Sequence, residues 1–212
     1  MSTELQELLQ PATTAVITVE CQRGVIGPNG PLPVLVETIR ESGLVARAAA
    51  LLDVARSCGA PVLHGTVVRR TDGGGVTMNC RLFTAVGKSG AQPLLAGSEA
   101  AALVPELGPG PNDWIVPRYH GVSLFHDTEL DAILRSLGVK TVVLLGASLN
   151  IAIVGTTIEA VNRGYRVVVP EDGVVGIPTE YGEAVLRNSM RLLATITRCD
   201  DVAAAFRAHA SA

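Results

Sequence analysis

Residues able to do chemistry follow three apolar runs of the chain. Glu20 ends the first such run, Arg118 ends another, and the turn Gly146–Asn150 ends a third. A carboxylate can accept or donate a proton, whereas a guanidinium keeps its proton near neutral pH and supplies only charge and hydrogen bonds. The backbone N–H groups of Leu149 to Ala152 begin a predicted helix, and a helix start favours an anion or a developing oxyanion. These residue types point to acid–base chemistry on a small carbonyl-containing substrate.

Six short β-branched runs predict the strands that position these residues, and helical spacing predicts helices between them. The strands are expected at 15–19, 62–64, 114–116, 141–145, 166–169 and 194–197, and the helices at 44–56, 150–163, 179–193, 200–208 and from the capping-box sequence Thr128–Asp131 to Gly138. This alternation predicts an α/β fold, a parallel sheet covered by helices on both faces. Ligands of such sheets bind outside the carboxyl ends of the strands. Glu20, Arg118 and the 146–152 turn should therefore share one crevice.

The stretch from about Val67 to Gly97 departs from this alternation. It contains Gly73-Gly-Gly75 and has no clear period. Long irregular segments inside a compact domain are usually lids, binding loops or subunit contacts, and the other interpretation is a disordered surface excursion.

Composition excludes several classes of protein. The 212 residues are 48% hydrophobic with a formal net charge of −3, which suits a folded core and argues against nucleic acid as a partner. The longest apolar stretch, 142–155, is interrupted and too short to span a membrane. The four cysteines form no CxxC pair, and no signal peptide is visible. We expect one soluble cytoplasmic domain over residues 1–212, with four reduced thiols.

Several motifs, taken in order, resemble the isochorismatase-like (cysteine hydrolase) superfamily. They are Val16-Ile-Thr-Val-Glu-Cys-Gln22, then Pro117-Arg118 with Phe125-His-Asp-Thr-Glu-Leu130, then Gly146-Ala-Ser-Leu-Asn-Ile-Ala152 with Thr156, Ala160, Gly164-Tyr165 and 168–172. The resemblance implies a three-layer α-β-α sandwich with a six-stranded parallel sheet in the order 3-2-1-4-5-6. It also implies a homodimer or homotetramer, and a non-proline cis peptide bond at Ala147–Ser148.

This sequence replaces every member of the catalytic trio that the resemblance implies. The family uses Asp, Lys and Cys to form a thioester with amides and related compounds. Here the matching positions hold Glu20, Arg118 and Ala152. Alanine has no nucleophilic atom, so a thioester at residue 152 is excluded. Family members that hydrolyse isochorismate also lack the cysteine, so the loss of the thiol does not by itself abolish hydrolysis.

Two functions fit these replacements. The first is a cysteine-independent hydrolase of a small carbonyl, amide or enol-ether substrate, in which Glu20 moves the proton and Arg118 gives electrostatic help. A buried Glu20 could act as an acid, but a neighbouring Arg118 favours its carboxylate form and the role of base. The alternative is a non-catalytic ligand-binding member of the superfamily, in which Glu20 and Arg118 form only a structural ion pair.

Further residues are expected to line a substrate site. The turn after the fourth strand offers Ser148, Leu149, Asn150 and Ile151, and the loop after the third strand offers His120 and Phe125. His120 could orient the substrate or relay a proton, and the other interpretation is a surface residue. Arg69, Arg70 and Arg81 could bind an anionic substrate, with solvated loop charges as the alternative.

The remaining polar candidates predict no metal and no cofactor. Some relatives bind zinc through an Asp-x-His group after the second strand, and His64-Gly-Thr-Val-Val-Arg-Arg70 does not reproduce it. His64 itself is expected to be a hydrogen-bonded core residue. Gly73-Gly-Gly75 lacks the Lys-Ser/Thr of a phosphate-binding loop. Cys21 should point to the sheet face opposite Glu20, which makes it a poor substitute nucleophile.

Overall fold

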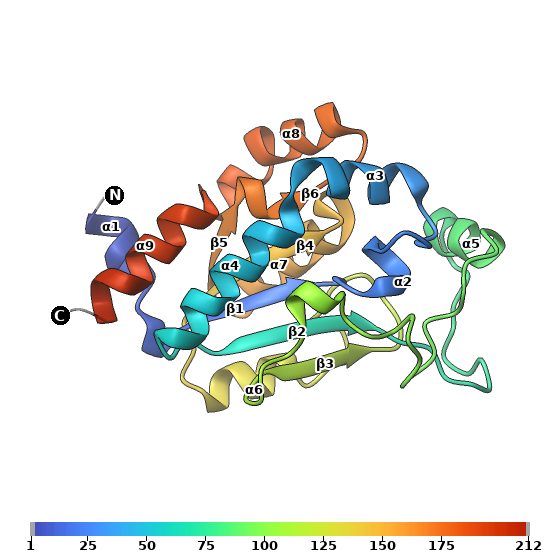
Figure 1. Cartoon of the computed structure of the whole chain (residues 1–212), viewed down its shortest axis with the longest axis horizontal. Coiled ribbons are helices and arrows are strands. Elements are labelled where there is room, and N and C mark those ends of the chain that lie inside the picture. Colours follow the sequence, from blue (N-terminus) through green and yellow to red (C-terminus); the bar gives the residue numbers. More distant parts are fainter. Residues whose placement is uncertain (1–2, 211–212) are drawn as a thin grey trace.

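A parallel sheet runs through the middle of the computed structural model, which describes residues 3–210 (Figure 1). Residues 1, 2, 211 and 212, at the ends of the expected domain, lie outside this part. Within it the strands follow the order β3-β2-β1-β4-β5-β7, with β6 paired to β4. Their bounds are β1 Thr14–Val19, β2 Val62–Val67, β3 Trp114–Arg118, β4 Thr141–Ala147, β5 Arg166–Pro170, β6 Val174–Val175 and β7 Thr195–Thr197. The order 3-2-1-4-5-6 is confirmed for the six predicted strands, and the two-residue β6 is additional.

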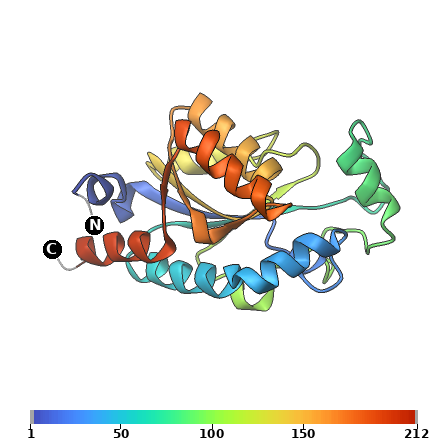
Figure 2. The same cartoon turned by 90° about the horizontal axis from the view of Figure 1, so that it is seen from above.

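Helices cover both faces of the sheet, which confirms the three-layer sandwich. Their bounds are α1 Thr3–Leu8, α2 Arg23–Ile26, α3 Pro33–Ser42, α4 Leu44–Ser57, α5 Arg81–Lys88, α6 Leu130–Ser136, α7 Val154–Asn162, α8 Thr179–Asn188 and α9 Cys199–Ala210. Apolar side chains of α1, α3, α4 and α9 form one core with the sheet, and those of α6, α7 and α8 form the other. Figure 2 shows α4 and α9 on one side of the sheet and α7 and α8 on the other.

The strand runs were predictable because the central strands are buried on both faces. Every residue of β1, β2 and β4 is buried, and β1 and β4 are rich in Val, Ile and Leu. Val19, the last residue of β1, pairs with Gly65 of β2 and with Gly146 of β4, and β2 and β3 continue for two more residues to the Val67–Arg118 pair. This alignment places the first residues after each strand at a common carboxyl edge.

Several helices were not predicted, or differ from the prediction. The sequence patterns did not indicate α1, α2, α3 or α5, and α8 ends at Asn188 rather than at residue 193. Thr128 does not form the expected capping box. Its hydroxyl accepts a hydrogen bond from the Leu130 backbone and donates one to the Leu124 carbonyl, while the Asp131 carboxylate bonds Arg135 and Tyr165. Helix α6 begins at Leu130, and the Thr128 side chain forms a local turn before it. The reciprocal hydrogen bonds between Thr128 and Asp131 that define a capping box are not formed.

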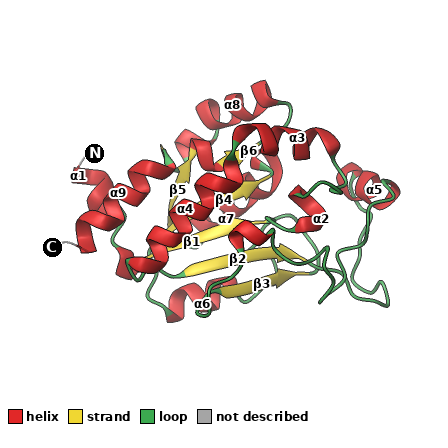
Figure 3. Cartoon of the chain, viewed as in Figure 1, coloured by secondary structure: helices red, strands yellow, loops and turns green. Residues whose placement is uncertain are grey.

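The segment 67–97 leaves the sheet at the end of β2, and its helix α5 lies away from the sheet (Figure 3). It is attached at its base, where the Arg69 backbone N–H donates to the Leu94 carbonyl at 2.7 Å and the Ala96 N–H donates to the Arg69 carbonyl at 3.0 Å. No residue of α5 is buried. In residues 3–210 no helix combines the length and apolar character needed to cross a bilayer.

His64 is a hydrogen-bonded core residue, as the sequence predicted. It is fully buried on β2, where Nδ1 lies 2.7 Å from Thr18 Oγ1 and Nε2 lies 3.1 Å from Asp113 Oδ2. Arg56 Nη2 donates to the same Asp113 oxygen at 2.7 Å. Burial lowers the pKa of His64 below its ordinary value of 6.5, although the Asp113 bond acts in the opposite direction. The folded protein therefore prefers a neutral imidazole.

This preference predicts that the fold loses stability in mild acid. Because the His64 pKa is lower in the folded than in the unfolded state, the unfolded chain takes up the proton more readily, and stability falls as the pH drops below about 6.5. The slope is at most about 1.4 kcal/mol per pH unit. Denaturant unfolding from pH 7.5 down to pH 5 measures it, and His64→Asn should flatten the profile in this range.

The matched control is His209→Asn, since the His209 imidazole bonds the Gln6 carbonyl and lies on α9, away from His64. It should keep the wild-type slope. An unfolding free energy that is constant in the wild type over this range, or an equal slope in the His64 variant, would contradict the assignment.

Candidate active site at the carboxyl edge of the sheet

Glu20 and Arg118 meet at the carboxyl edge of the sheet, as predicted. The Arg118 Nη2 donates to Glu20 Oε1 at 2.5 Å, across the end of β2, which lies between β1 and β3. The side chain of Glu20 is 17% exposed and that of Arg118 is 4% exposed. The Glu20 side chain is therefore partly exposed to solvent, whereas the Arg118 side chain is buried.

The backbone at Glu20 turns sharply to present this carboxylate. Its φ of 55° lies in the left-handed region that side chains other than glycine rarely adopt. Its N–H donates to the Gly65 carbonyl at 2.9 Å, so the turn begins while the residue is still paired to β2. On the other side, a Cβ at Gly146 would lie 2.4 Å from the Val19 carbonyl oxygen. Only glycine lets β4 pass this closely beside the turn.

Gln22 fastens the same edge from inside. Its side chain is fully buried, and its amide nitrogen donates to the carbonyls of Val67 and Ala101, each at 2.8 Å. Its amide oxygen accepts the Val67 N–H at 2.7 Å. Gln22 therefore ties the chain after β1 to the end of β2. The sequence analysis included Gln22 only as part of a motif and did not predict these contacts. Its role is to fix the position of the backbone after β1.

Positive charge exceeds negative charge around the Glu20–Arg118 pair. The Arg118 Nε and Nη1 atoms are buried and have no hydrogen-bond partner in the described part of the chain. Arg69, just beyond β2, is partly buried and donates through Nη1 to the Tyr119 carbonyl at 2.9 Å, next to Arg118. Burial lowers the pKa of Arg69, repulsion from Arg118 lowers it further, and Glu20 opposes this. Two guanidiniums thus lie near one carboxylate, and Arg118 alone is hydrogen-bonded to it.

The sequence left Arg69 open between an anion ligand and a solvated loop charge, and the structure places it beside the pair. The signal that could have selected it is its position, two residues past the end of β2 at the carboxyl edge. Arg70 differs, because it is exposed and forms an ion pair with Asp72 at 2.6 Å. Arg81 lies at the start of the outlying helix α5.

The turn after β4 is wider than the predicted helix start. Leu149–Ile153 forms a π-helical turn before α7 begins at Val154, and Ala147–Ser148 is a cis peptide bond, as the resemblance implied. The Ile151 and Ile153 N–H groups donate to the Ser148 carbonyl, so the Ile151 N–H already has an acceptor. Leu149 and Ala152 are buried, and Ser148 is partly exposed.

Two of the residues expected to bind substrate have structural partners. The Asn150 amide exchanges hydrogen bonds of 3.3 and 3.4 Å with the Ile177 backbone, which ties the turn to the segment before α8. Phe125 is 4% exposed, stacks on Tyr165 and lies beneath the Arg163 guanidinium. It offers little surface to a ligand. Ile151 is 39% exposed, and the side chain of His120 is 38% exposed beside Asp127 and His126.

No cysteine stands where a replacement nucleophile is needed, and all four are unpaired. Burial first, and then the Glu20 charge, raise the pKa of the Cys21 thiol to about 12. Cys21 is fully buried and belongs to the core cluster that includes α4 and α9. Burial also raises the pKa of Cys199 to about 12, and Cys80 is exposed at the start of α5.

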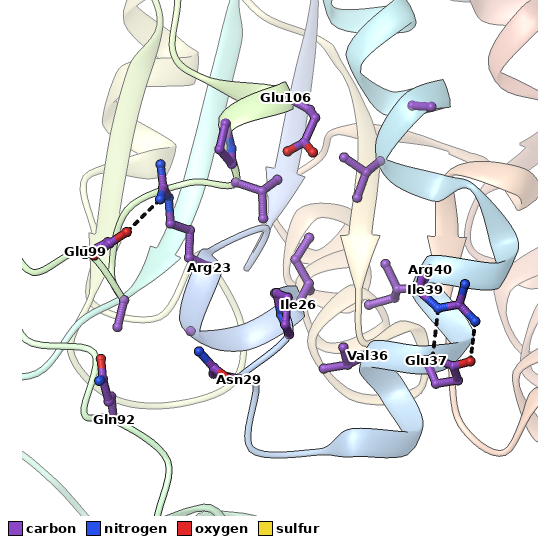
Figure 4. A pocket seen from close by; sticks show the side chains of 18 of the residues that line it. Arg23, Ile26, Asn29, Val36, Glu37, Ile39, Arg40, Gln92, Glu99 and Glu106 are labelled. Carbon is purple, nitrogen blue, oxygen red and sulfur yellow. Dashed lines mark hydrogen bonds and ion pairs between the residues drawn. The ribbon is translucent and has the colours of Figure 1, made fainter.

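A large hollow lies beside this site but is not part of it. It measures about 890 Å³ and is lined by residues of α2, α3 and the 99–106 segment (Figure 4). An ion pair of 2.8 Å between Arg23 and Glu99 lies at one end, and Glu37 bonds Arg40 at the other. Glu20, Arg118 and Ala152 do not line it.

Known proteins resemble the chain in both sequence and fold. The isochorismatase domain family matches residues 14–201. Ureidoacrylate amidohydrolase RutB of Methylobacterium radiotolerans is 33% identical over 177 residues, which cover 77% of this chain and 67% of that protein.

Solved structures repeat the architecture over most of the chain. A cysteine hydrolase from Pseudomonas syringae pv. phaseolicola superposes with a TM-score of 0.84 at 23% identity, covering 95% of this chain and 96% of the other. N-carbamoylsarcosine amidase from Thermoplasma acidophilum superposes with a TM-score of 0.70 at 25% identity, covering 89% and 97%. The first of these likenesses concerns the fold alone.

Proposed function

The chain belongs to the isochorismatase family, and from this premise we propose that it is a hydrolase of small anionic amides that works without a thiol nucleophile. The observation that carries the proposal is the accessible Glu20 carboxylate held 2.5 Å from the buried Arg118. Its relatives named for amide hydrolysis support the bond type. Ala152, at the position of the missing nucleophile, leaves water as the attacking group.

Glu20 serves as the general base in this proposal. Its free carboxylate oxygen takes a proton from water as the water oxygen forms a bond to the carbonyl carbon of the substrate. The carbonyl oxygen gains negative charge, which the positive charge of Arg118 stabilises, while Arg69 binds the substrate's own negative charge. Glu20 then returns the proton to the nitrogen as the carbon–nitrogen bond breaks. An enol ether would instead take its proton directly from a protonated Glu20.

The turn after β4 would position the substrate. Ser148 and Ile151 expose surface at the same carboxyl edge, while Leu149 and Asn150 keep the turn in place through burial and the Ile177 contacts. The backbone N–H groups of Leu149, Asn150 and Ala152 are the proposed oxyanion donors. His120 and Phe125 remain candidates on the loop after β3, with His120 the more exposed of the two.

A non-catalytic ligand-binding protein is the second candidate. The observation that favours it is the same pair, because a buried guanidinium needs a carboxylate partner whether or not the carboxylate reacts. The two candidates differ in what Glu20 does, so substitution of Glu20 separates them.

We predict that Glu20→Gln lowers kcat about 10²- to 10⁴-fold, because the amide keeps the shape but cannot accept a proton. The assay is hydrolysis of a panel of small amides, ureas and enol ethers, including isochorismate and ureidoacrylate. Glu99→Gln, which removes an exposed carboxylate bound to Arg23, is the matched control and should leave turnover unchanged.

Thermal unfolding of both variants separates lost chemistry from lost folding. Equal turnover in the wild type and Glu20→Gln would remove Glu20 from the mechanism. Binding of a panel compound without any turnover in the wild type would favour the ligand-binding protein.

We predict that Arg69→Gln raises KM for anionic substrates about 10- to 100-fold with little change in kcat, since hydrogen bonds to charged groups contribute about 1.5–3 kcal/mol. Uncharged substrates of the same bond type should be unaffected. The control is Arg70→Gln, because Arg70 is exposed and paired with Asp72. Equal losses for charged and uncharged substrates would contradict an anion-binding role.

We also propose a cytoplasmic homodimer or homotetramer. Four unpaired cysteines, one of them exposed, suit a reducing compartment. At the edge of the sheet, Trp114 and Ile115 of β3 are 44% and 46% exposed, and an apolar edge strand is a surface that a second copy could cover.

Light scattering after size exclusion should give two or four times the chain mass of 22.0 kDa at micromolar concentration. Ile115→Lys should shift the protein toward the monomer, because it places a charge in the apolar edge. A monomeric wild-type protein would contradict the proposal. Leu192 is 82% exposed elsewhere on the surface, so dissociation by Leu192→Lys and not by Ile115→Lys would show that the interface does not include β3.

A further inference from the structure

Three metal-binding side chains converge on the loop after β3. They are His120, His126 and Asp127, and one ligand atom from each lies within 4.8 Å of the other two. The two imidazoles face the same carboxylate oxygen, with Nε2 of His120 and Nε2 of His126 each 3.4 Å from Asp127 Oδ2. The mechanism proposed above assigns no role to His126 or Asp127.

These separations suit a shared cation better than direct hydrogen bonds. Hydrogen bonds between nitrogen and oxygen usually measure about 2.7–3.2 Å, so both contacts are long. Zinc binds imidazole nitrogen and carboxylate oxygen at about 2.0–2.1 Å, and a tetrahedron of that size has edges of about 3.3–3.4 Å. Two of the three ligand separations therefore already match a tetrahedral site.

The backbone of the loop holds the three side chains together. Gly121 has a φ of +76°, and a Cβ there would lie 2.7 Å from the His126 ring, so glycine lets the ring fold back against the loop. Asp127 has a φ of 50°, which turns its carboxylate toward both rings. The middle of the loop is anchored, because Leu124 is fully buried and its N–H donates to Thr156 Oγ1 at 3.1 Å.

Exposure and charge fit a cation that arrives from solvent. The side chains of His120, His126 and Asp127 are 38%, 54% and 71% exposed. Two neutral imidazoles and one carboxylate give the set a single negative charge. Imidazole ligands favour zinc, cobalt, nickel and copper over magnesium and calcium, which prefer oxygen alone.

We propose that His120, His126 and Asp127 bind one divalent cation of the zinc class, with a fourth position open to water. The sequence analysis predicted no metal because the Asp-x-His pattern after the second strand is absent. The set His120, His126 and Asp127 lies after the third strand and is a different group of residues. His64, after which that pattern would fall, is buried between Thr18 and Asp113 and is not a ligand. The proposal does not depend on the hydrolase assignment, because His126 and Asp127 have no part in that mechanism and the test measures metal binding, although His120 is also a candidate substrate-binding residue.

Metal binding by the untagged, chelator-treated protein tests this. Isothermal titration calorimetry with zinc should show one equivalent of zinc bound per chain. Addition of cobalt should produce the visible absorption of a tetrahedral nitrogen–oxygen site. His120→Ala and His126→Ala should each weaken zinc binding about tenfold or more, because loss of even an outer-shell partner costs roughly that much. Asp127→Asn should weaken it as well.

His209→Ala is the matched control, because it removes a histidine outside the cluster and should leave zinc binding unchanged. Circular dichroism of each variant checks that the fold is intact. Absence of stoichiometric binding in the wild type would overturn the proposal, and so would zinc affinity that is unchanged in the His120→Ala/His126→Ala double variant.

Discussion

A charged pair at the edge of an apolar sheet is the constraint on which the site depends. Arg118 is almost entirely buried, and a buried guanidinium is costly unless a carboxylate lies against it. Glu20 supplies that carboxylate from two strands away, which requires the chain to turn at once after β1, two residues before β2 and β3 end. Three features allow this one contact. They are the left-handed backbone conformation of Glu20, the hydrogen bonds of Gln22 to the end of β2, and the absence of a side chain at Gly146 beside Val19.

The Glu20 carboxylate does not balance the positive charge of the two arginines near it. Arg118 keeps two donors without partners, and Arg69 adds a second guanidinium that binds only backbone carbonyls. Positive charge on buried or partly buried side chains attracts an anion more strongly than the same charge in water. This imbalance suits a substrate that brings its own negative charge, and it is equally suited to negative charge that develops on a carbonyl oxygen.

The sequence predicted the frame of the site better than its contents. The buried strands were readable because Val, Ile and Leu fill both faces of β1 and β4, and the carboxyl-edge rule then selected Glu20 and Arg118. Helix α3 was missed because its short apolar pattern follows the proline-rich 28–33 segment, and α5 because no core fixes its period. The meeting of His120 with Asp127 depends on positive φ angles at Gly121 and Asp127, which residue types do not specify. Phe125 looked like a pocket residue, yet it packs under Arg163.

Glu20, Arg118 and Ala152 replace the family's catalytic trio, and of these three residues Glu20 is the one whose side chain can gain or lose a proton. Arginine holds its proton throughout the physiological range, so Arg118 cannot pass a proton to a leaving group as a lysine can. Every proton that moves between water and the leaving nitrogen must then pass through Glu20, the substrate or solvent. One carboxylate can serve both halves of an amide hydrolysis, because the proton it takes from water in the first step is the one that the nitrogen needs in the second. A thiol-free site with a single accessible carboxylate is therefore chemically complete, provided that the positive charge around it stabilises the intermediate between the two transfers.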